Sequence, residues 1–191
     1  NIPKPMLEIS GIPLLEITIN YLRNLGLSDI MISTYYLPDK IKNYFGHGEK
    51  HEVNISYLDE KNPSGTAGCL SLIPENTKAS NFLVINGDIL TRLNYLELIE
   101  SHANNNNDIT IGTVLYEHVV PYGVLSSSKG RVNLIEEKPK ITKEVSAGIY
   151  VIEKFVLDNY LEKGSYMDMP DLIKALINKN KKVATFPIHE Y

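Results

Sequence analysis

The chain has 191 residues, 43% of them hydrophobic and 22% charged, which is ordinary for a globular protein and sufficient for one domain with a sizeable core. Its net charge of −4 argues against a nucleic-acid-binding surface, and its only cysteine, Cys69, excludes an internal disulfide and a thiolate metal cluster. No apolar stretch approaches the ~20 residues that cross a bilayer, and no signal peptide opens the chain. We therefore expect no membrane contact and a cytoplasmic location.

Apolar periodicity predicts helices and strands that alternate along the first part of the chain. The predicted elements are helices at 14–25, 38–45, 67–73 and 95–103 and strands at 29–34, 53–58, 82–85 and 109–115. Strands follow at 122–125, 131–136 and 147–152, then helices at 154–161 and 170–178 and a last strand at 183–188. This order predicts a single α/β domain over 1–191, with a Rossmann-like, mostly parallel sheet flanked by helices and a small strand-rich insertion.

The motif Asn86-Gly87-Asp88 follows the predicted strand at 82–85. A carboxylate just beyond the carboxyl end of a buried parallel strand lies where α/β sheets bind ligands, and it can hold a divalent metal against substrate phosphates. Asn-Gly is also typical of a tight turn between strands, because both residues tolerate positive φ. The segment that follows has helical rather than strand-like spacing, which favours a ligand site.

Two further motifs have a functional and an ordinary interpretation. In Pro3-Lys4-Pro5 the prolines would keep the backbone extended and present the Lys4 ammonium to a phosphate, although an exposed lysine is the commoner case. Gly65, Thr66, Ala67 and Gly68 lie where a strand passes into a helix, so their amides could face a ligand and the glycines could admit a flat ring. The alternative is a simple helix start with Thr66 as its N-cap.

The later strands carry two more candidate motifs. In Glu136-Glu137-Lys138-Pro139 a carboxylate could accept hydrogen bonds from sugar hydroxyls while the ammonium meets a phosphate, or the run could be a charged surface turn. Gly148 lies inside a strand pattern, and an interior glycine often marks a close approach of the backbone to another group.

In chain order these motifs resemble those of the sugar-phosphate nucleotidyltransferase family, which makes NDP-sugars from an NTP and a sugar 1-phosphate. The matching stretches are KPML at Lys4, SGTAG at Ser64, NGD at Asn86, PYGV at Pro121, EEKP at Glu136, SAGIY at Ser146 and DMPDL at Asp168. The resemblance implies in-line attack by the sugar-phosphate oxygen on the α-phosphorus of the NTP, with release of pyrophosphate. Such a reaction depends on charge neutralisation and positioning more than on acid–base groups.

The resemblance also implies a role for each matching residue. Lys4, Asp88 and Lys138 would be catalytic, with Asp88 binding Mg²⁺ and the two lysines contacting phosphates. The substrates would be bound by Gly65, Thr66, Ala67 and Gly68 at the base, by Asn86 and Gly87 beside the metal, and by Gly123, Glu137 and Gly148 at the sugar. The partners would be the NTP and the sugar 1-phosphate, and a homo-oligomer is compatible with the family.

The type of base is suggested by finer similarity. The GTAG stretch, PYGV and the terminal His189-Glu190-Tyr191 are most similar to guanylyltransferase-type members, which favours GTP. Thymidylyl, uridylyl and cytidylyl transfer remain open, because backbone contacts that spacing does not reveal decide the base.

The chain departs from the family pattern at both ends. The glycine-rich loop with its arginine, and the strand that carries it, do not precede Pro3-Lys4-Pro5, and the segment with a second metal-binding aspartate does not follow His189. We therefore expect a domain truncated at both ends, of uncertain activity as it stands. A partner chain, a swap or a neighbouring segment could fill the slot of the missing strand, and an unfilled slot would leave unpaired sheet edges.

Two alternatives from other classes remain. One is a noncatalytic paralogue that binds sugar nucleotides and regulates a partner enzyme, although it would have no need of Lys4, Asp88 and Lys138. The other is a metal-dependent glycosyltransferase, which normally has a second acidic residue two positions after the first, where this chain has Leu90.

Overall fold

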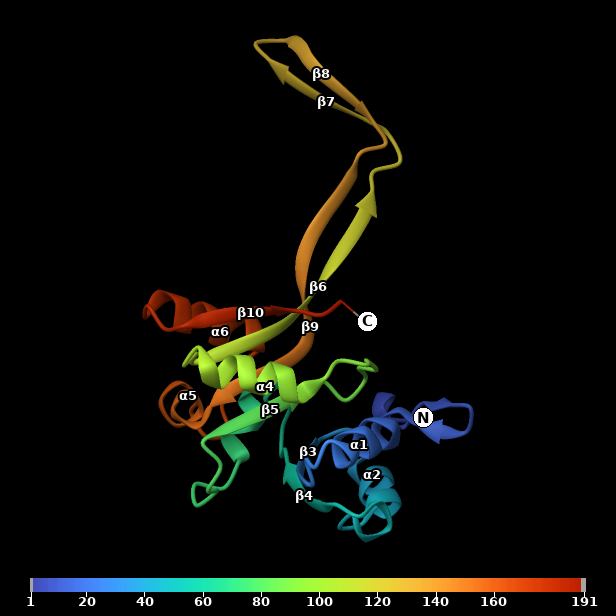
Figure 1. Cartoon of the computed structure of the whole chain (residues 1–191), viewed down its shortest axis with the longest axis vertical. Coiled ribbons are helices and arrows are strands. Elements are labelled where there is room, and N and C mark those ends of the chain that lie inside the picture. Colours follow the sequence, from blue (N-terminus) through green and yellow to red (C-terminus); the bar gives the residue numbers. More distant parts are fainter. Residues whose placement is uncertain (1, 190–191) are drawn as a thin grey trace.

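A mixed four-stranded sheet, in the order β10-β6-β9-β5, forms the centre of the computed structural model, which describes residues 2–189 (Figure 1). Its strands are β5 (Asn81–Ile85), β6 (Ile109–Val119), β9 (Lys140–Glu153) and β10 (Val183–Pro187). β10 runs parallel to β6, whereas β9 runs antiparallel to both β6 and β5. The strand at the middle of this sheet is therefore the one that returns from the strand-rich region of the sequence.

Alternate side chains of β9 enter two different cores, one on each face of the sheet. Tyr150 and Ile152 pack with α5 (Lys154–Tyr160) and α6 (Met169–Asn178). Ile149 and Val151 pack with α4 (Tyr95–Asn104) and α1 (Leu14–Asn24). The period of two along the strand thus places helices on both faces, as in other α/β domains.

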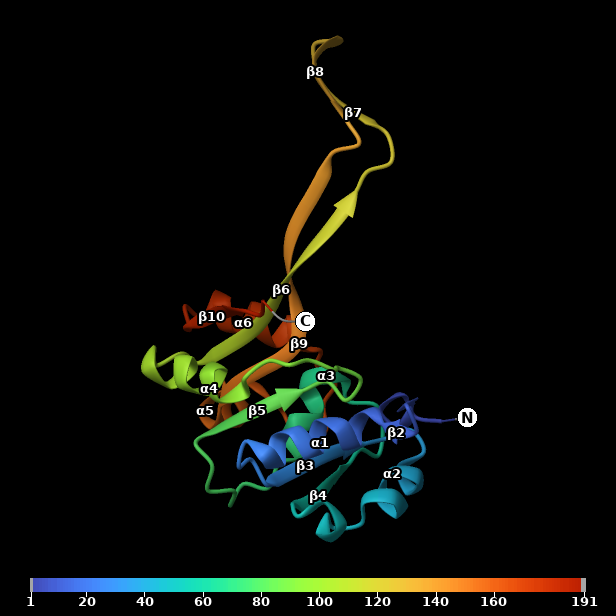
Figure 2. The same cartoon turned by 45° about the vertical axis from the view of Figure 1, so that its right-hand side comes forward.

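A smaller parallel pair, β3 (Asp29–Thr34) and β4 (Asn54–Asp59), lies apart from the central sheet and packs against α1 and α2 (Pro38–Phe45) (Figure 2). Its core contains Ile19, Ile32, Ile41, Phe45, Val53 and Ile55. In the described part of the chain, β3 is paired with β4 alone and β5 with β9 alone. Both strands thus have one unpaired edge within residues 2–189.

A two-stranded arm extends from the body (Figures 1 and 2). β6 is buried as far as Thr113 and largely exposed beyond it, while its ladder with β9 continues to the pair Val119–Lys140. The far end of the arm is the hairpin of β7 (Gly123–Ser128) and β8 (Arg131–Glu137), all of whose residues are exposed. A two-stranded ladder without a packed face has little stability of its own.

The remaining elements are short. They are the 3₁₀ helices η1 (Lys4–Met6), η2 (Glu49–His51) and η3 (Cys69–Leu72), the strands β1 (Glu8–Ile9) and β2 (Ile12–Pro13), and the four-residue helix α3 (Gly65–Gly68). Among residues 2–189, no helix combines the length and the apolar character needed to cross a bilayer.

Each predicted helix and strand has an observed counterpart, and the α/β architecture is confirmed. The expectation of a mostly parallel sheet is wrong for the strand pairs that the structure describes, of which β3–β4 and β6–β10 alone are parallel. The reason is that β9 begins at Lys140, seven residues before the predicted strand, and returns beside β6 as the second half of the arm. Glu190 and Tyr191 of the terminal motif lie outside the described residues.

Candidate functional site

The Asn86-Gly87-Asp88 motif forms a turn directly after β5. Asn86 N donates a hydrogen bond to Gly148 O (2.9 Å), and Ile89 N closes the turn on Asn86 O (3.1 Å). The next regular element is α4, so the turn does not belong to a hairpin. Asp88 is exposed, and no residue in 2–189 is hydrogen-bonded or ion-paired to its carboxylate. That carboxylate is therefore free to bind a ligand at the carboxyl edge of β5.

Gly148 is held against this turn by its backbone conformation. Its φ is +74°, and a Cβ at this position would lie 2.6 Å from Asn86 Nδ2 and 3.1 Å from Asn86 Cγ. A larger residue would meet both backbone strain and a steric clash. The predicted close approach at Gly148 is confirmed, and the group that approaches is the side chain of Asn86.

The Pro3-Lys4-Pro5 segment contacts the same turn. A Cβ on Gly87 would lie 3.0 Å from Pro5 Cγ, so Gly87 admits the proline ring. The predicted extended backbone is wrong: Met6 N donates to Pro3 O (2.8 Å) and Leu7 N to Lys4 O (3.1 Å), which makes a 3₁₀ turn. Proline tolerates the first turn of a helix because it needs no N–H there. The turn leaves Lys4 exposed, one residue from the contact with Gly87.

The amides of the Gly65–Gly68 segment bind protein rather than facing a ligand. Ala67 N and Gly68 N both donate to Met167 O (3.0 and 2.9 Å), and Thr66 N donates to Asp168 Oδ1 (3.1 Å). The expectation that these three amides face a ligand is therefore wrong. The glycines serve the same packing, since a Cβ on Gly65 would lie 2.5 Å from Met167 O.

The side chains of Thr66 and Asp168 each accept a hydrogen bond from the start of the other residue's helix. Asp168 is the N-cap residue of α6, yet its carboxylate accepts from α3, while Thr66 Oγ1 accepts from Met169 N at the start of α6 (2.8 Å). The Tyr166 hydroxyl, which donates to Asp168 Oδ2 (2.7 Å), and the Thr66 amide hold the pKa of Asp168 below its usual range. The two helix starts are thus bonded to each other, and Thr66 is not the N-cap of α3.

The arm carries Gly123, Glu137 and Lys138 away from the Asp88 turn (Figure 1). Gly123 is paired with Glu137 in the β7–β8 ladder, and Glu137 Oε1 lies 4.0 Å from Lys138 Nζ. Both side chains are more than half exposed, at 73% and 63%. The structure therefore brings these three residues together but separates them from Gly148 and Asp88.

The candidate metal site contains a single protein carboxylate. Among residues 2–189, no group of three or more His, Cys, Asp or Glu side chains could hold an ion. Mg²⁺ keeps several waters and is commonly bound through one or two carboxylates together with substrate phosphates. An exposed, unpaired Asp88 fits that type of site, in which the substrate supplies the remaining charged ligands.

Sequence reasoning did not identify the residues that hold these motifs in place. Met167 and Asp168 support the Gly65–Gly68 segment from about a hundred positions further along the chain. Nothing in the spacing of DMPDL points to a partner for Asp168. The Pro3-Lys4-Pro5 motif by itself gives Pro5 no contact with Gly87.

One known protein family matches almost the whole chain. The sequence model of the nucleotidyl transferase family matches residues 1–190. The chain belongs to the nucleotidyl transferase family.

Named relatives of this family are about 30% identical to the chain over the aligned residues. It is 30% identical to mannose-1-phosphate guanyltransferase 2 of Candida glabrata, covering all of this chain and 55% of the relative. It is 29% identical to D-glycero-alpha-D-manno-heptose 1-phosphate guanylyltransferase of Aneurinibacillus thermoaerophilus, covering 86% of this chain and 73% of the relative. The chain thus spans about half the length of the first of these relatives.

A solved nucleotidyl transferase-like structure has the same fold. The crystal structure of HddC from Yersinia pseudotuberculosis complexed with GMP-PN superposes with a TM-score of 0.77 at 28% identity. The match covers all of this chain and 83% of that chain. The arrangement of sheet, helices and arm is therefore that of a known fold.

Proposed function

We propose that this chain transfers a nucleotidyl group from an NTP, preferably GTP, to a sugar 1-phosphate, giving an NDP-sugar and pyrophosphate. One observation carries the proposal: three motifs expected to meet at the substrate, Pro3-Lys4-Pro5, Asn86-Gly87-Asp88 and Gly148, are in contact at the carboxyl edge of β5. Membership of the family supports the reaction class. The guanylyltransferase names of two relatives and the GMP-PN bound to a similar structure support GTP.

The roles of the residues follow from charge and position. The Lys4 ammonium and the Asp88 carboxylate would act on the triphosphate, Lys4 by contacting its oxygens and Asp88 by holding Mg²⁺. The bound ion would neutralise charge on the phosphates and leave the α-phosphorus open to in-line attack. Asn86 and Gly87 would border this centre, and Gly148, which admits the Asn86 side chain, would line the sugar. Gly65, Thr66, Ala67 and Gly68 would border the base, through side chains and carbonyl oxygens rather than through the amides already bonded.

The arm would supply the remaining contacts with the sugar phosphate. Glu137 would accept hydrogen bonds from sugar hydroxyls, Lys138 would meet the phosphate, and Gly123 would give the sugar room between them. This role requires the arm to bend toward the Asp88 turn when substrate binds. Its exposed two-stranded ladder has no packed face to hold it straight, which supports such bending.

We further propose that the chain is most of a single nucleotidyltransferase domain. The 191 residues include no glycine-rich loop with an arginine before Pro3-Lys4-Pro5 and no second metal-binding segment after His189. Loss of one preorganised donor costs on the order of 100-fold in rate. Activity in a longer protein that restores both segments is therefore expected to exceed the activity of this chain.

The cytoplasm, where NTPs are abundant, is the location we propose. A homo-oligomer also belongs to the proposal, because the arm exposes apolar side chains that a second copy would cover. These side chains are Leu115, Tyr116, Val119, Tyr122, Leu125, Val132, Leu134 and Ile135. Light scattering of the purified chain measures the assembly directly.

The test is release of pyrophosphate from each of five NTPs with mannose 1-phosphate or a heptose 1-phosphate, with and without Mg²⁺. GTP and Mg²⁺ together are expected to give the highest rate. Asp88→Asn is expected to lower that rate by about 100-fold, whereas Asp39→Asn, an exposed control in the first turn of α2, is expected to leave it unchanged. Wild-type rates from Asp88→Asn in the longer protein would contradict the metal assignment.

The same assay separates the two alternatives. A noncatalytic paralogue would bind the nucleotide in a thermal-shift experiment but release no pyrophosphate even in the longer protein. A glycosyltransferase would release a nucleoside diphosphate from an NDP-sugar, which is a different product.

A further inference from the structure

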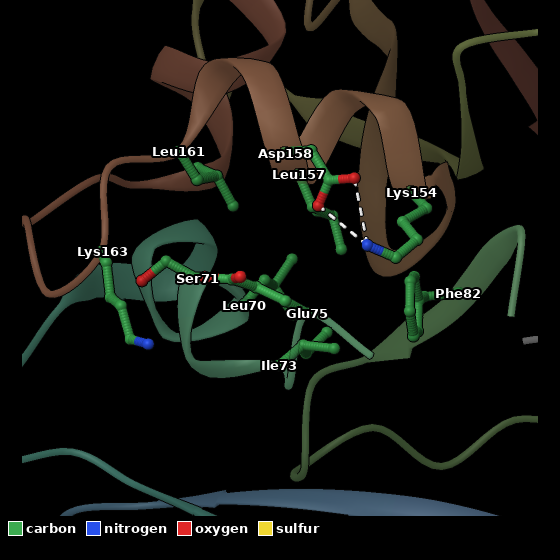
Figure 3. Close-up of a pocket in the computed structure, with 10 residues that line it drawn as sticks. All are labelled: Leu70, Ser71, Ile73, Glu75, Phe82, Lys154, Leu157, Asp158, Leu161 and Lys163. Atoms are coloured by element: carbon green, nitrogen blue, oxygen red, sulfur yellow. Dashed lines mark hydrogen bonds and ion pairs between the residues drawn. The ribbon is translucent and has the colours of Figure 1, made fainter. Parts of the chain in front are cut away.

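A second pocket lies at the opposite end of β5 from the Asp88 turn. Its volume is about 420 Å³, which is within the range of small-molecule sites. It is formed by η3, the loop after it, the start of β5 and α5, and Phe82 stands where the strand begins (Figure 3). Because Asn86 follows the other end of the strand, this pocket is separate from the proposed active site.

Five apolar side chains line this pocket beside its polar and charged residues. Five of its residues belong to or pack against the core cluster under α5 and α6. They are Leu70, Ile73, Phe82, Leu157 and Leu161. An apolar group of a ligand seated here would lie against these five side chains and gain from leaving water.

Four charged side chains line the pocket, and two of them neutralise each other. Lys154 Nζ donates to both Asp158 Oδ1 and Asp158 Oδ2, each at 3.0 Å. Lys163 and Glu75 are exposed and make no hydrogen bond or ion pair with the other residues of 2–189. In Figure 3, Lys163 lies at one end of the pocket and the Lys154–Asp158 pair at the other, with Glu75 between them.

We propose that this pocket binds a small zwitterion with an apolar side chain, of which an apolar α-amino acid is the simplest example. Its carboxylate pairs with Lys163 and its ammonium with Glu75, the lining cation and anion that no other group of residues 2–189 engages. Its side chain lies against the five apolar residues. A singly charged ligand can pair with only one of these two groups, and an uncharged ligand with neither.

Both walls of the pocket continue into the segment proposed to border the base. Ser71 Oγ donates to Gly68 O (2.6 Å) and accepts from Gly164 N (3.2 Å), which ties the two walls together. From Gly164 the chain runs directly to Met167 and Asp168, which bond the amides of the Gly65–Gly68 segment. A ligand that orders these walls therefore strengthens nucleotide binding, a coupling that rests on the proposed function and is reciprocal.

The direct test is isothermal titration of the whole chain with L-leucine and L-phenylalanine as probes. The controls are 4-methylpentanoate, which lacks the ammonium, and 3-methylbutylamine, which lacks the carboxylate. At least one amino acid is expected to bind about tenfold more tightly than either control, the difference of one partly exposed charged contact. No binding of either amino acid, or equal binding of the truncated probes, would overturn the proposal.

Matched variants locate the binding. Lys163→Met and Glu75→Gln are each expected to weaken amino-acid binding about fivefold or more, with circular dichroism to verify the fold. Lys50→Met and Glu100→Gln change the same residue types at exposed positions away from the pocket and are expected to have no effect. Unchanged binding in both pocket variants would refute the assignment.

A final titration measures the affinity for GTP with and without the bound amino acid. An affinity at least about threefold higher is expected when the pocket is filled, a coupling of typical size. If GTP does not bind at all, the proposed function fails while the amino-acid titration still reports on the pocket. If both ligands bind independently, the coupling is refuted and the pocket stands.

Discussion

Replacement of Gly148 by alanine perturbs the turn that carries Asp88 without touching Asp88 itself. Two costs add at this position. Alanine at a φ of +74° costs about 1–2 kcal/mol, because a left-handed backbone brings Cβ close to a carbonyl oxygen. The new Cβ would also lie 2.6 Å from Asn86 Nδ2, so the Asn86 side chain has to move.

The second cost, displacement of the Asn86 side chain, affects both stability and turnover. If the movement of the Asn86 side chain weakens the hydrogen bond from the Asn86 backbone N–H to Gly148 O, the free energy of unfolding falls by about 1 kcal/mol more. The total of roughly 2–3 kcal/mol corresponds to a Tm lowered by about 5–10 °C in a domain of this size. Displacement of the turn by even a fraction of an ångström lowers turnover, and a 1 Å error costs about 100-fold.

Urea unfolding and pyrophosphate release measure the two effects separately. Gly26→Ala is the matched control, because Gly26 has a φ of +80° and nothing lies within 4 Å of its added Cβ. It should lose only the backbone cost, about 1–2 kcal/mol, and keep its activity. If Gly148→Ala matches Gly26→Ala in both stability and turnover, the contact with Asn86 has no importance and the reasoning about this turn is refuted.

Three further predictions concern the supports of the site and of the sheet. Thr66→Val removes the acceptor for the first N–H of α6 and is expected to cost about 1 kcal/mol in urea unfolding, whereas Thr66→Ser keeps it; equal losses would contradict the role of the hydroxyl. Folding lowers the pKa of Asp168, so its contribution to stability is present above its unfolded pKa of about 4 and is lost as the pH falls through the lower folded value. In Asp168→Asn the free energy of unfolding should therefore depend less on pH in this acidic range. An unchanged pH dependence would count against the contact. His102, which is fully buried between Thr110 Oγ1 (2.9 Å) and Glu153 Oε1 (3.1 Å), should cost about 2 kcal/mol or more when changed to leucine, because both partners lose a bond; a smaller loss by calorimetry would mean that water replaces the imidazole.

Local patterns were sufficient to predict most of the helices and strands. Asn94 is of a residue type that favours the N-cap position, and its Oδ1 accepts from Leu96 N (3.2 Å). The glycine in the last strand of the insertion was expected to mark a close approach, and Gly148 does. Capping and glycine geometry depend on neighbours within a few residues or on the backbone itself, so the sequence records them.

Contacts across long stretches of chain could not be predicted in the same way. The partner of Thr66 is 102 residues away, and no periodicity points from one to the other. The same limitation explains why the first half of β9 was not predicted. Its first seven residues are all exposed, so they show no alternation of buried and exposed side chains, and they form a strand only because they pair with β6. The sequence therefore predicted which residues could form the site, but not that Glu137 and Lys138 lie on an arm away from it.

The edge position of β5 determines how firmly the Asp88 carboxylate is held. In the described part of the chain β5 is bonded along one side only, to β9, so the backbone groups on its other side are open to exchange with solvent deuterium. The turn at its end rests on a single ladder, together with the packing of Pro5 against Gly87. Any segment that pairs with the open side would restrain β5 along its length. The Asp88 carboxylate in the turn after β5 would then move less.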